Sequence, residues 1–213
     1  MKLYADLHIF MKQPIARFLI RPEFLLTLIA AAWLGNALYA FGVSGGLVKY
    51  YSPAIVAVAM IAFVLLHGVQ RYGKRLIGQF VLTVFTIGWT FETISIVTGI
   101  PFGTYHYTEI MAPFLGHVPV FVLPAYGVMG YASWSLATLI LGQRGAGLDR
   151  VGLVLVPILA ALLMVFWDLS MDHLRASVEG RWVWAEGGAH YGIPWMNYLG
   201  WMLVTWLMFQ IFA

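Results

Sequence analysis

Three carboxylic acids stand in segments that are otherwise apolar, and they are the residues of this chain best suited to chemistry. Glu92, Asp168 and Asp172 lie inside or at the ends of stretches long enough to cross a membrane. A carboxylate in hydrocarbon is costly unless it has a partner, water or a function. Glu92 and Asp168 each precede a loop rich in Gly, Pro, Trp, Tyr and His. The repeated arrangement predicts that these two junctions form one site.

The spacing of the acids indicates a role in acid–base catalysis. Asp168 and Asp172 are four residues apart and therefore share one face of a helix. Two carboxyl groups in one apolar site can share a proton, which makes one of them a candidate general acid. A simpler explanation for Asp172 is an ion pair with Arg175 or Arg181. Glu92 has no basic residue within one helical turn, so a local salt bridge does not account for it.

Aromatic and amide side chains around these acids are candidates for contact with a substrate. A single Trp or Tyr at a membrane interface is more often an ordinary belt residue. The six His show no His-x-x-x-His or His-Glu-x-x-His spacing, and Cys is absent. We therefore expect neither a metal site nor a cofactor. The candidate substrate-binding residues are Tyr105, Tyr107, Tyr126, Trp167, Trp182, Trp184, Asn197 and Trp201.

The composition determines the class of protein that must position these residues. Apolar residues make up 62% of the 213 residues and charged residues 10%, with a mean hydropathy of +0.84. These values exceed those of soluble domains and predict an integral membrane protein with a single domain, residues 1–213. Basic residues cluster at the ends of the apolar segments, where they can meet lipid headgroups. The sequence pI near 9.2 therefore does not indicate a nucleic-acid partner.

Apolar stretches of about 20 residues, the length that crosses a hydrocarbon core, predict an all-α, polytopic membrane helix bundle. Residues 3–20 mix apolar and polar side chains and predict an additional interfacial helix. Two residues of the first span, Asn36 and Tyr39, would reach the level of Asn197 and Trp201. The six predicted transmembrane helices are 24–43, 53–70, 76–98, 118–141, 151–171 and 195–212.

The distribution of Lys and Arg predicts the orientation, since positive charge is retained on the cytoplasmic side. Nine basic residues fall on one side of the predicted spans, and only Lys49, Arg175 and Arg181 fall on the other. We expect both termini in the cytoplasm of a prokaryotic cell, and the three acids near the outer face of the cytoplasmic membrane. The nine are Lys2, Lys12, Arg17, Arg21, Arg71, Lys74, Arg75, Arg144 and Arg150.

Short motifs between residues 88 and 201 resemble, in their order and context, the membrane carotenoid hydratase family. This chain has His173 where that family usually has Pro, and Tyr126 where it usually has Trp. The resemblance covers the region of the acids and of both loops. The motifs are Phe91-Glu92, Thr98-Gly99-Ile100-Pro101-Phe102-Gly103, Tyr105-His106-Tyr107, Val118-Pro119, Trp167-Asp168-Leu169-Ser170-Met171-Asp172, Gly180-Arg181-Trp182-Val183-Trp184, Tyr191-Gly192-Ile193-Pro194, Asn197 and Gly200-Trp201.

The resemblance implies addition of water to the terminal 1,2 double bond of an acyclic (psi) carotenoid end, which gives a tertiary alcohol. Acid-catalysed hydration passes through a tertiary cation and requires a neutral buried acid, a positioned water and aromatic walls. We expect Asp168 to donate the proton, Glu92 to orient water, and Asp172 to be the coupled carboxylate. Asp168 and Glu92 could exchange roles. The partners would be a carotenoid and membrane lipid, and the oligomeric state stays open.

Two other functions remain compatible with the sequence. A carotenoid end-group cyclase begins with the same protonation but excludes water, so an internal double bond captures the cation. A transporter or lipophile-binding protein could use intramembrane acids as a proton relay. A relay would spread its carboxylates along the depth of the bilayer, whereas these three group toward one face.

Overall fold

The computed structural model describes residues 23–24, 27, 30–31, 34, 46–143 and 147–213. Most of these residues belong to α4 (Gly46–Thr98), α5 (Val122–Ile140), α6 (Gly152–His173) and α7 (Trp195–Phe212). A π-helical segment, η2 (Leu174–Val178), continues α6. The predicted interfacial helix 3–20, most of the predicted span 24–43, and the residues Asn36 and Tyr39 lie outside the described residues.

The predicted helical class is confirmed for the described chain, because predicted spans coincide with helices. The spans 151–171 and 195–212 match α6 and α7 within two residues. The span 118–141 begins later than predicted, since α5 starts only at Val122. Within the described ranges, two helical segments are long and apolar enough to cross a membrane by length and composition: Ile55–Thr98 and Gly152–Val178.

The predicted spans 53–70 and 76–98 both fall within α4, which is interrupted at Gly73. Its φ of 81° and ψ of 162° are not helical, and a residue with a Cβ would be strained there. The described residues belong to two compact units, Met1–Ile77 and Gly78–Ala213. In the first unit, the ring of Phe63 stacks on His67 at 5.1 Å. Every predicted site residue lies in the second unit.

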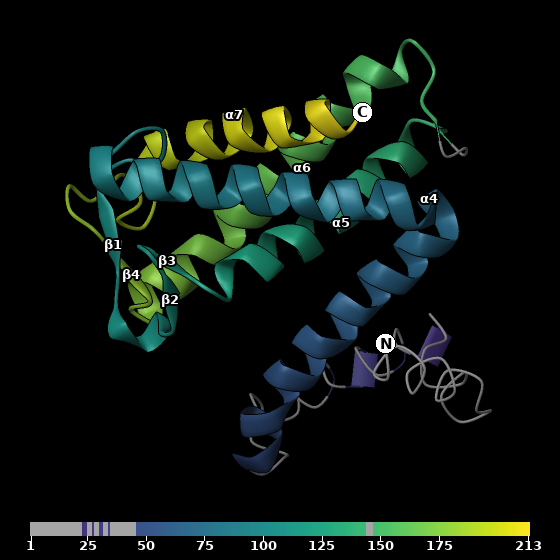
Figure 1. Ribbon diagram of the computed structural model, residues 1–213. Coiled ribbons are helices and arrows are strands. Elements are labelled where there is room, and N and C mark those ends of the chain that lie inside the picture. Colours follow the sequence, from purple (N-terminus) through teal and green to yellow (C-terminus); the bar gives the residue numbers. More distant parts are fainter. Residues whose placement is uncertain (1–22, 25–26, 28–29, 32–33, 35–45, 144–146) are drawn as a thin grey trace. The chain divides into compact units, whose positions relative to one another are not determined.

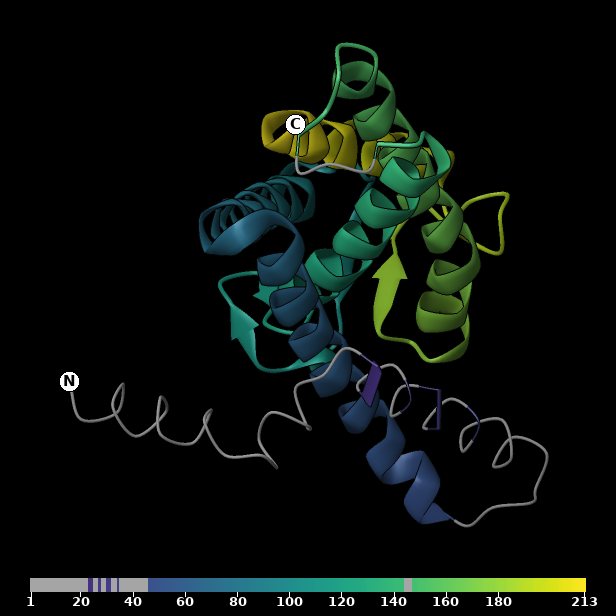
Figure 2. The same ribbon diagram turned by 90° about the vertical axis from the view of Figure 1, so that its right-hand side faces the viewer.

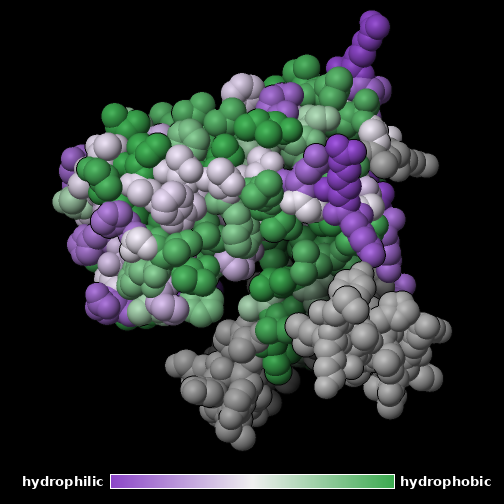
Figure 3. All heavy atoms as spheres, viewed as in Figure 1, coloured by the Kyte–Doolittle hydropathy of each residue, from purple (hydrophilic) through white to green (hydrophobic). Residues whose placement is uncertain are grey.

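In the second unit, α6 packs between α5 and α7 (Figure 1 and Figure 2). Ala160 and Ala161 of α6 are completely buried, and such small side chains allow helices to approach closely. Phe80 of α4 packs edge-on against Tyr131 of α5 and Phe212 of α7. Many large apolar side chains point outward from these helices, and apolar surface prevails along their sides in Figure 3. This pattern suits helices that face lipid.

Two short antiparallel ribbons lie at one end of these helices and were not predicted (Figure 1). Strand β1 (Tyr105–Tyr107) pairs with β4 (Trp182–Trp184), and β2 (Phe114–Leu115) pairs with β3 (Val118–Pro119). A 3-10 turn, η1 (Glu109–Met111), follows β1. The all-α prediction is therefore incomplete. Alternating aromatic side chains favour strands, but a three-residue strand gives too weak a sequence signal to detect.

The turn after α4 is held tightly against α7. A Cβ at Gly200 would lie 2.6 Å from Cδ1 of Phe102 and 2.7 Å from the Pro101 carbonyl oxygen. Only glycine allows this approach. On the other side of the turn, the Phe102 backbone N–H donates to Oγ of Ser95 at 3.1 Å. The start of β1 is thus fixed relative to both α4 and α7.

Candidate functional site

The Glu92 carboxylate is buried and accepts hydrogen bonds from phenols on two other elements. Tyr105 and Tyr107 of β1 both donate to Oε2, the latter at 2.9 Å. Tyr126 of α5 donates to Oε1 at 2.8 Å. The side chain is only 3% exposed. Neutral hydroxyl donors therefore satisfy both oxygens of this acid, and no Lys or Arg of the described chain pairs with it.

The ribbon of β1 and β4 positions two of these phenols. Tyr105 stands opposite Trp184 and Tyr107 opposite Trp182, so four aromatic side chains share one face of the ribbon. The Tyr105 ring lies 4.8 Å from Trp184, and the Tyr107 ring 5.9 Å from Trp182. Burial first, and the Glu92 carboxyl second, raise the pKa of both tyrosines well above the usual range. Both phenols consequently remain donors at neutral pH.

Asp168 and Asp172 form the second half of the site and share one donor. The Asn197 side-chain amide, on α7, donates to Oδ2 of Asp168 and to Oδ2 of Asp172, each at 2.8 Å. The indole N–H of Trp182 donates to Oδ1 of Asp172 at 2.7 Å. Both acids are at most 2% exposed. The Asn197 amide therefore holds the two carboxyl groups next to each other.

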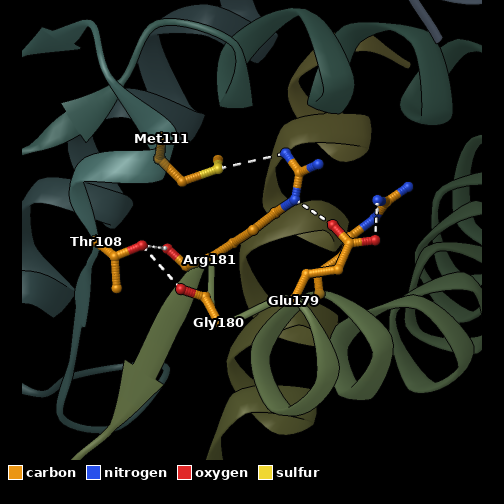
Figure 4. A network of polar contacts seen from close by, with 6 residues as sticks. Thr108, Met111, Glu179, Gly180 and Arg181 are labelled. Carbon is orange, nitrogen blue, oxygen red and sulfur yellow. Dashed lines mark hydrogen bonds and ion pairs between the residues drawn. The ribbon is translucent and has the colours of Figure 1, made fainter. Parts of the chain in front are cut away.

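The predicted alternative for Asp172, an ion pair with Arg175 or Arg181, is not what the structure shows. Both arginines pair with Glu179 instead (Figure 4). Partial burial raises the pKa of Glu179, but the hydrogen bonds from the two arginines prevail and lower it overall. The Thr108 hydroxyl, at the end of β1, donates to the Gly180 carbonyl at 2.8 Å. This polar network closes one end of the ribbon, and within the described residues Asp172 has no ion pair with a Lys or Arg.

Contacts between aromatic side chains connect the two halves of the site. Tyr107, which donates to Glu92, contacts the ring of Trp182, and Trp182 in turn donates to Asp172. Trp201 of α7 stacks on Tyr126, with ring centroids 4.6 Å apart and planes 12° apart. Trp167 of α6 meets the Trp201 ring edge-on at 6.0 Å. The structure thus brings together all of the predicted site residues.

Among the three acids, Asp168 is the one with a carboxyl oxygen that accepts no hydrogen bond from the described residues. Both oxygens of Glu92 and both oxygens of Asp172 accept hydrogen bonds. No donor in the described part of the chain engages Oδ1 of Asp168, whose only hydrogen bond is at Oδ2. An oxygen that accepts no hydrogen bond from the protein has both of its lone-pair positions available to carry a proton toward a substrate. This geometry favours Asp168 over the other two acids as proton donor.

Two residues near the aspartates were not among the predicted site residues. Tyr198 follows Asn197, is 4% exposed, and its hydroxyl has no hydrogen-bond partner in the described chain. His190 interacts electrostatically with Asp172, and its Nε2 lies 3.2 Å from the Leu169 carbonyl oxygen. The His190 ring meets that of Tyr198 edge-on at 5.5 Å. In the sequence, Tyr198 could have been noticed because it directly follows Asn197 in a segment rich in aromatic residues.

Comparison with known proteins identifies the relatives of this chain. Residues 52–213 match a protein family described as carotenoid biosynthesis protein. The chain is 34% identical over 136 residues to the bisanhydrobacterioruberin hydratase of Haloarcula japonica, a match that covers 63% of this chain. The matched region spans only 42% of that relative's length. No solved structure matches the chain.

Proposed function

This chain belongs to the carotenoid biosynthesis protein family, and from that premise we propose that it adds water to the terminal 1,2 double bond of an acyclic carotenoid end. The named relative is a hydratase, which supports hydration as the reaction type. The observation that carries the proposal is the buried Asp168, whose Oδ1 accepts no hydrogen bond within the described residues, in a site that aromatic contacts join to Glu92. A proton donor, a second polar group and apolar walls are the parts that alkene hydration needs.

The reaction begins with proton transfer from Oδ1 of Asp168 to the less substituted carbon of the double bond. The bond's electron pair forms the new C–H bond and leaves a tertiary cation at the neighbouring carbon. The Asn197 amide stabilises the resulting aspartate through its hydrogen bond to Oδ2. Aromatic rings of the site stabilise the cation by cation–π attraction without bonding to it.

Water then captures the cation, and Glu92 takes the proton that the water loses. Oε1 of Glu92 accepts one hydrogen bond, from Tyr126, whereas a carboxylate oxygen can accept two. The remaining lone pair can bind and orient the attacking water. The product is a tertiary alcohol and the reaction needs no redox step. If Glu92 were instead the acid and Asp168 the base, the Glu92→Gln variant would give different products.

We expect a specific change of mass when the protein is made in bacterial membranes that accumulate lycopene. Hydration gives a carotenoid heavier by one water per modified end, because a water molecule adds across each double bond. Mass spectrometry of the extracted pigments measures this. An isomer of unchanged mass as the sole product would identify a cyclase and contradict the proposal. Unchanged lycopene, with the protein present in the membrane, would contradict any reaction at this end group.

We further propose that the site lies toward the outer face of the cytoplasmic membrane, with both termini inside, on the basis of the nine-to-three Lys and Arg distribution. Cysteines that replace Glu109 and Glu186, both exposed on the loop side of the site, should react with an impermeant thiol reagent added to intact cells. Gly188 is unsuitable for a label, because a Cβ there would lie 2.0 Å from the Ile193 carbonyl oxygen. If the cysteines were labelled only after cell lysis, the orientation in the membrane would be the opposite of the one proposed.

A further inference from the structure

The hydrogen-bond donors around Asp168 and Asp172 are distributed unequally between the two acids. The Asn197 amide donates one hydrogen to Oδ2 of each carboxyl group, at 2.8 Å in both cases. The indole N–H of Trp182 donates to the second oxygen of Asp172, Oδ1, at 2.7 Å. Of the four carboxyl oxygens in this pair, Oδ1 of Asp168 is therefore the one that accepts no hydrogen bond from the described residues.

The chemistry of the donors fixes the direction of these hydrogen bonds. The two aspartates use both hydrogens of the Asn197 amide group, and neither an amide NH2 nor an indole N–H has an acceptor site. The aspartate oxygens must therefore accept in all three bonds. Hydrogen bonds to a carboxylate favour its ionised form, and two carboxyl groups that share one apolar site do not readily ionise together. Asp172, with a donor on each oxygen, is favoured as the ionised member of the pair.

The β1–β4 ribbon holds the Trp182 indole in place. Trp182 stands opposite Tyr107 in the ribbon, and the two rings meet edge-on at 5.9 Å. The neighbouring Arg181 carbonyl accepts from both the backbone N–H and the hydroxyl of Thr108, at 3.0 and 3.1 Å (Figure 4). The donor to Asp172 thus comes from a fixed strand that is separate from the helices that carry the aspartates and Asn197.

The titratable groups around the pair make no hydrogen bond to either aspartate within the described residues. Nε2 of His190 lies 3.2 Å from the Leu169 carbonyl oxygen, and the His190 ring meets that of Tyr198 edge-on. The Trp184 indole lies near Asp172, but its buried N–H forms no hydrogen bond of normal geometry there. The groups considered are Glu92, Tyr107, Tyr126, Arg175, Arg181, His190 and Tyr198.

We propose that Trp182 is a positioning residue that keeps the negative charge of the pair on Asp172 and so keeps the reactive proton on Oδ1 of Asp168. Trp182 acts through Asp172 and does not need to touch the substrate. Asn197 donates to both acids equally, so it holds them together without selecting between them. This inference rests on the proposed function, because it explains how the proposed proton donor stays protonated before the substrate binds.

Infrared spectroscopy of the purified protein, without substrate, tests the position of the proton. A protonated carboxyl group has a carbonyl stretch that a carboxylate lacks, and isotope labelling of the four aspartates of the chain identifies it. The wild type should show this band. Asp168→Asn should lack it, because Asp172 keeps both of its N–H donors. In Trp182→Phe the band should split, because each acid then has one donor and the two share the proton.

Three spectroscopic results would overturn the proposal. One is a wild-type protein without the band, which would mean that both aspartates are ionised. Another is a band that persists in Asp168→Asn, which would place the proton outside Asp168. The third is a band that Trp182→Phe leaves unchanged, which would show that the indole does not select between the two acids.

Hydration rates in proteoliposomes test whether Trp182 acts through Asp172. Trp182→Phe should slow hydration at least about tenfold, because a hydrogen bond to a charged group is lost. In the Asp172→Asn background, the same substitution should slow the reaction less than about twofold, since the carboxylate that Trp182 serves is absent. Equal slowing in both backgrounds would make Trp182 only a wall of the pocket and would contradict the positioning role.

Trp134→Phe is the matched control, because Trp134 of α5 is a buried tryptophan whose indole N–H has no hydrogen-bond partner in the described chain. It should leave both the infrared band and the hydration rate near their wild-type values. Thermal unfolding of each variant in detergent verifies that folded proteins are compared. A wild-type protein that forms no hydrated carotenoid would refute the proposed function, whereas the infrared spectra would still decide which aspartate holds the proton.

Discussion

Replacement of Asp168 with Asn should lower the hydration rate by at least about 100-fold, the usual contribution of a positioned general acid. Asn is similar in size and can still accept from Asn197 through its side-chain oxygen, so the packing of α6 on α7 should persist. It has no proton to deliver to the alkene. The measurement is the amount of hydrated and unreacted lycopene in membranes that contain equal amounts of each protein. Neither the alcohol nor an isomer should form, because the cation never arises.

A suitable control for Asp168→Asn is Glu186→Gln, which removes an acid from an exposed position in the loop before α7. This control should retain wild-type activity. Asp172→Asn should have a smaller effect than Asp168→Asn, since both oxygens of Asp172 are already engaged by Trp182 and Asn197. Wild-type activity in Asp168→Asn would remove this residue from the mechanism. A much larger loss in Asp172→Asn would make that residue the donor instead.

Glu92→Gln should also lower formation of the alcohol by about 100-fold or more, but with a different set of products. Asp168 is still present and can protonate the double bond, so the cation can form. The Gln side chain does not accept a proton from the attacking water. We therefore expect some of the cation to lose a proton elsewhere, which gives carotenoid isomers of unchanged mass. Chromatography with mass detection separates these isomers from the alcohol.

This distribution of products tests which acid has which role. If Glu92 were the proton donor, Glu92→Gln would leave lycopene unreacted and Asp168→Asn would give the isomers. The substitution also disturbs the three phenols, because a Gln amide group donates where the carboxylate accepted. Tyr105→Phe separates this disturbance from the lost base, since it removes a donor and retains the carboxylate. Its loss of activity should be clearly smaller than that of Glu92→Gln.

The sequence alone was sufficient to predict the helical class and the family, and it singled out side chains that the fold brings close together. Long apolar stretches predict helices because each helix satisfies its own backbone hydrogen bonds, a requirement that depends on local residues only. Acids within such stretches are rare enough to identify Glu92 and Asp168 as functional candidates. The predicted family is confirmed by the match over residues 52–213.

Only the tertiary structure decided how those residues are partnered. Glu92 binds phenols 13, 15 and 34 positions away, and Asn197 reaches Asp168 across 29 positions. Such pairs depend on helix packing and on the β1–β4 ribbon, for which no local periodicity exists. Proximity in sequence favoured Arg175 and Arg181 as partners of Asp172, yet both pair with Glu179, which is also near in sequence and more exposed. Charged side chains pair where desolvation costs least, and burial of each group is a property of the folded chain.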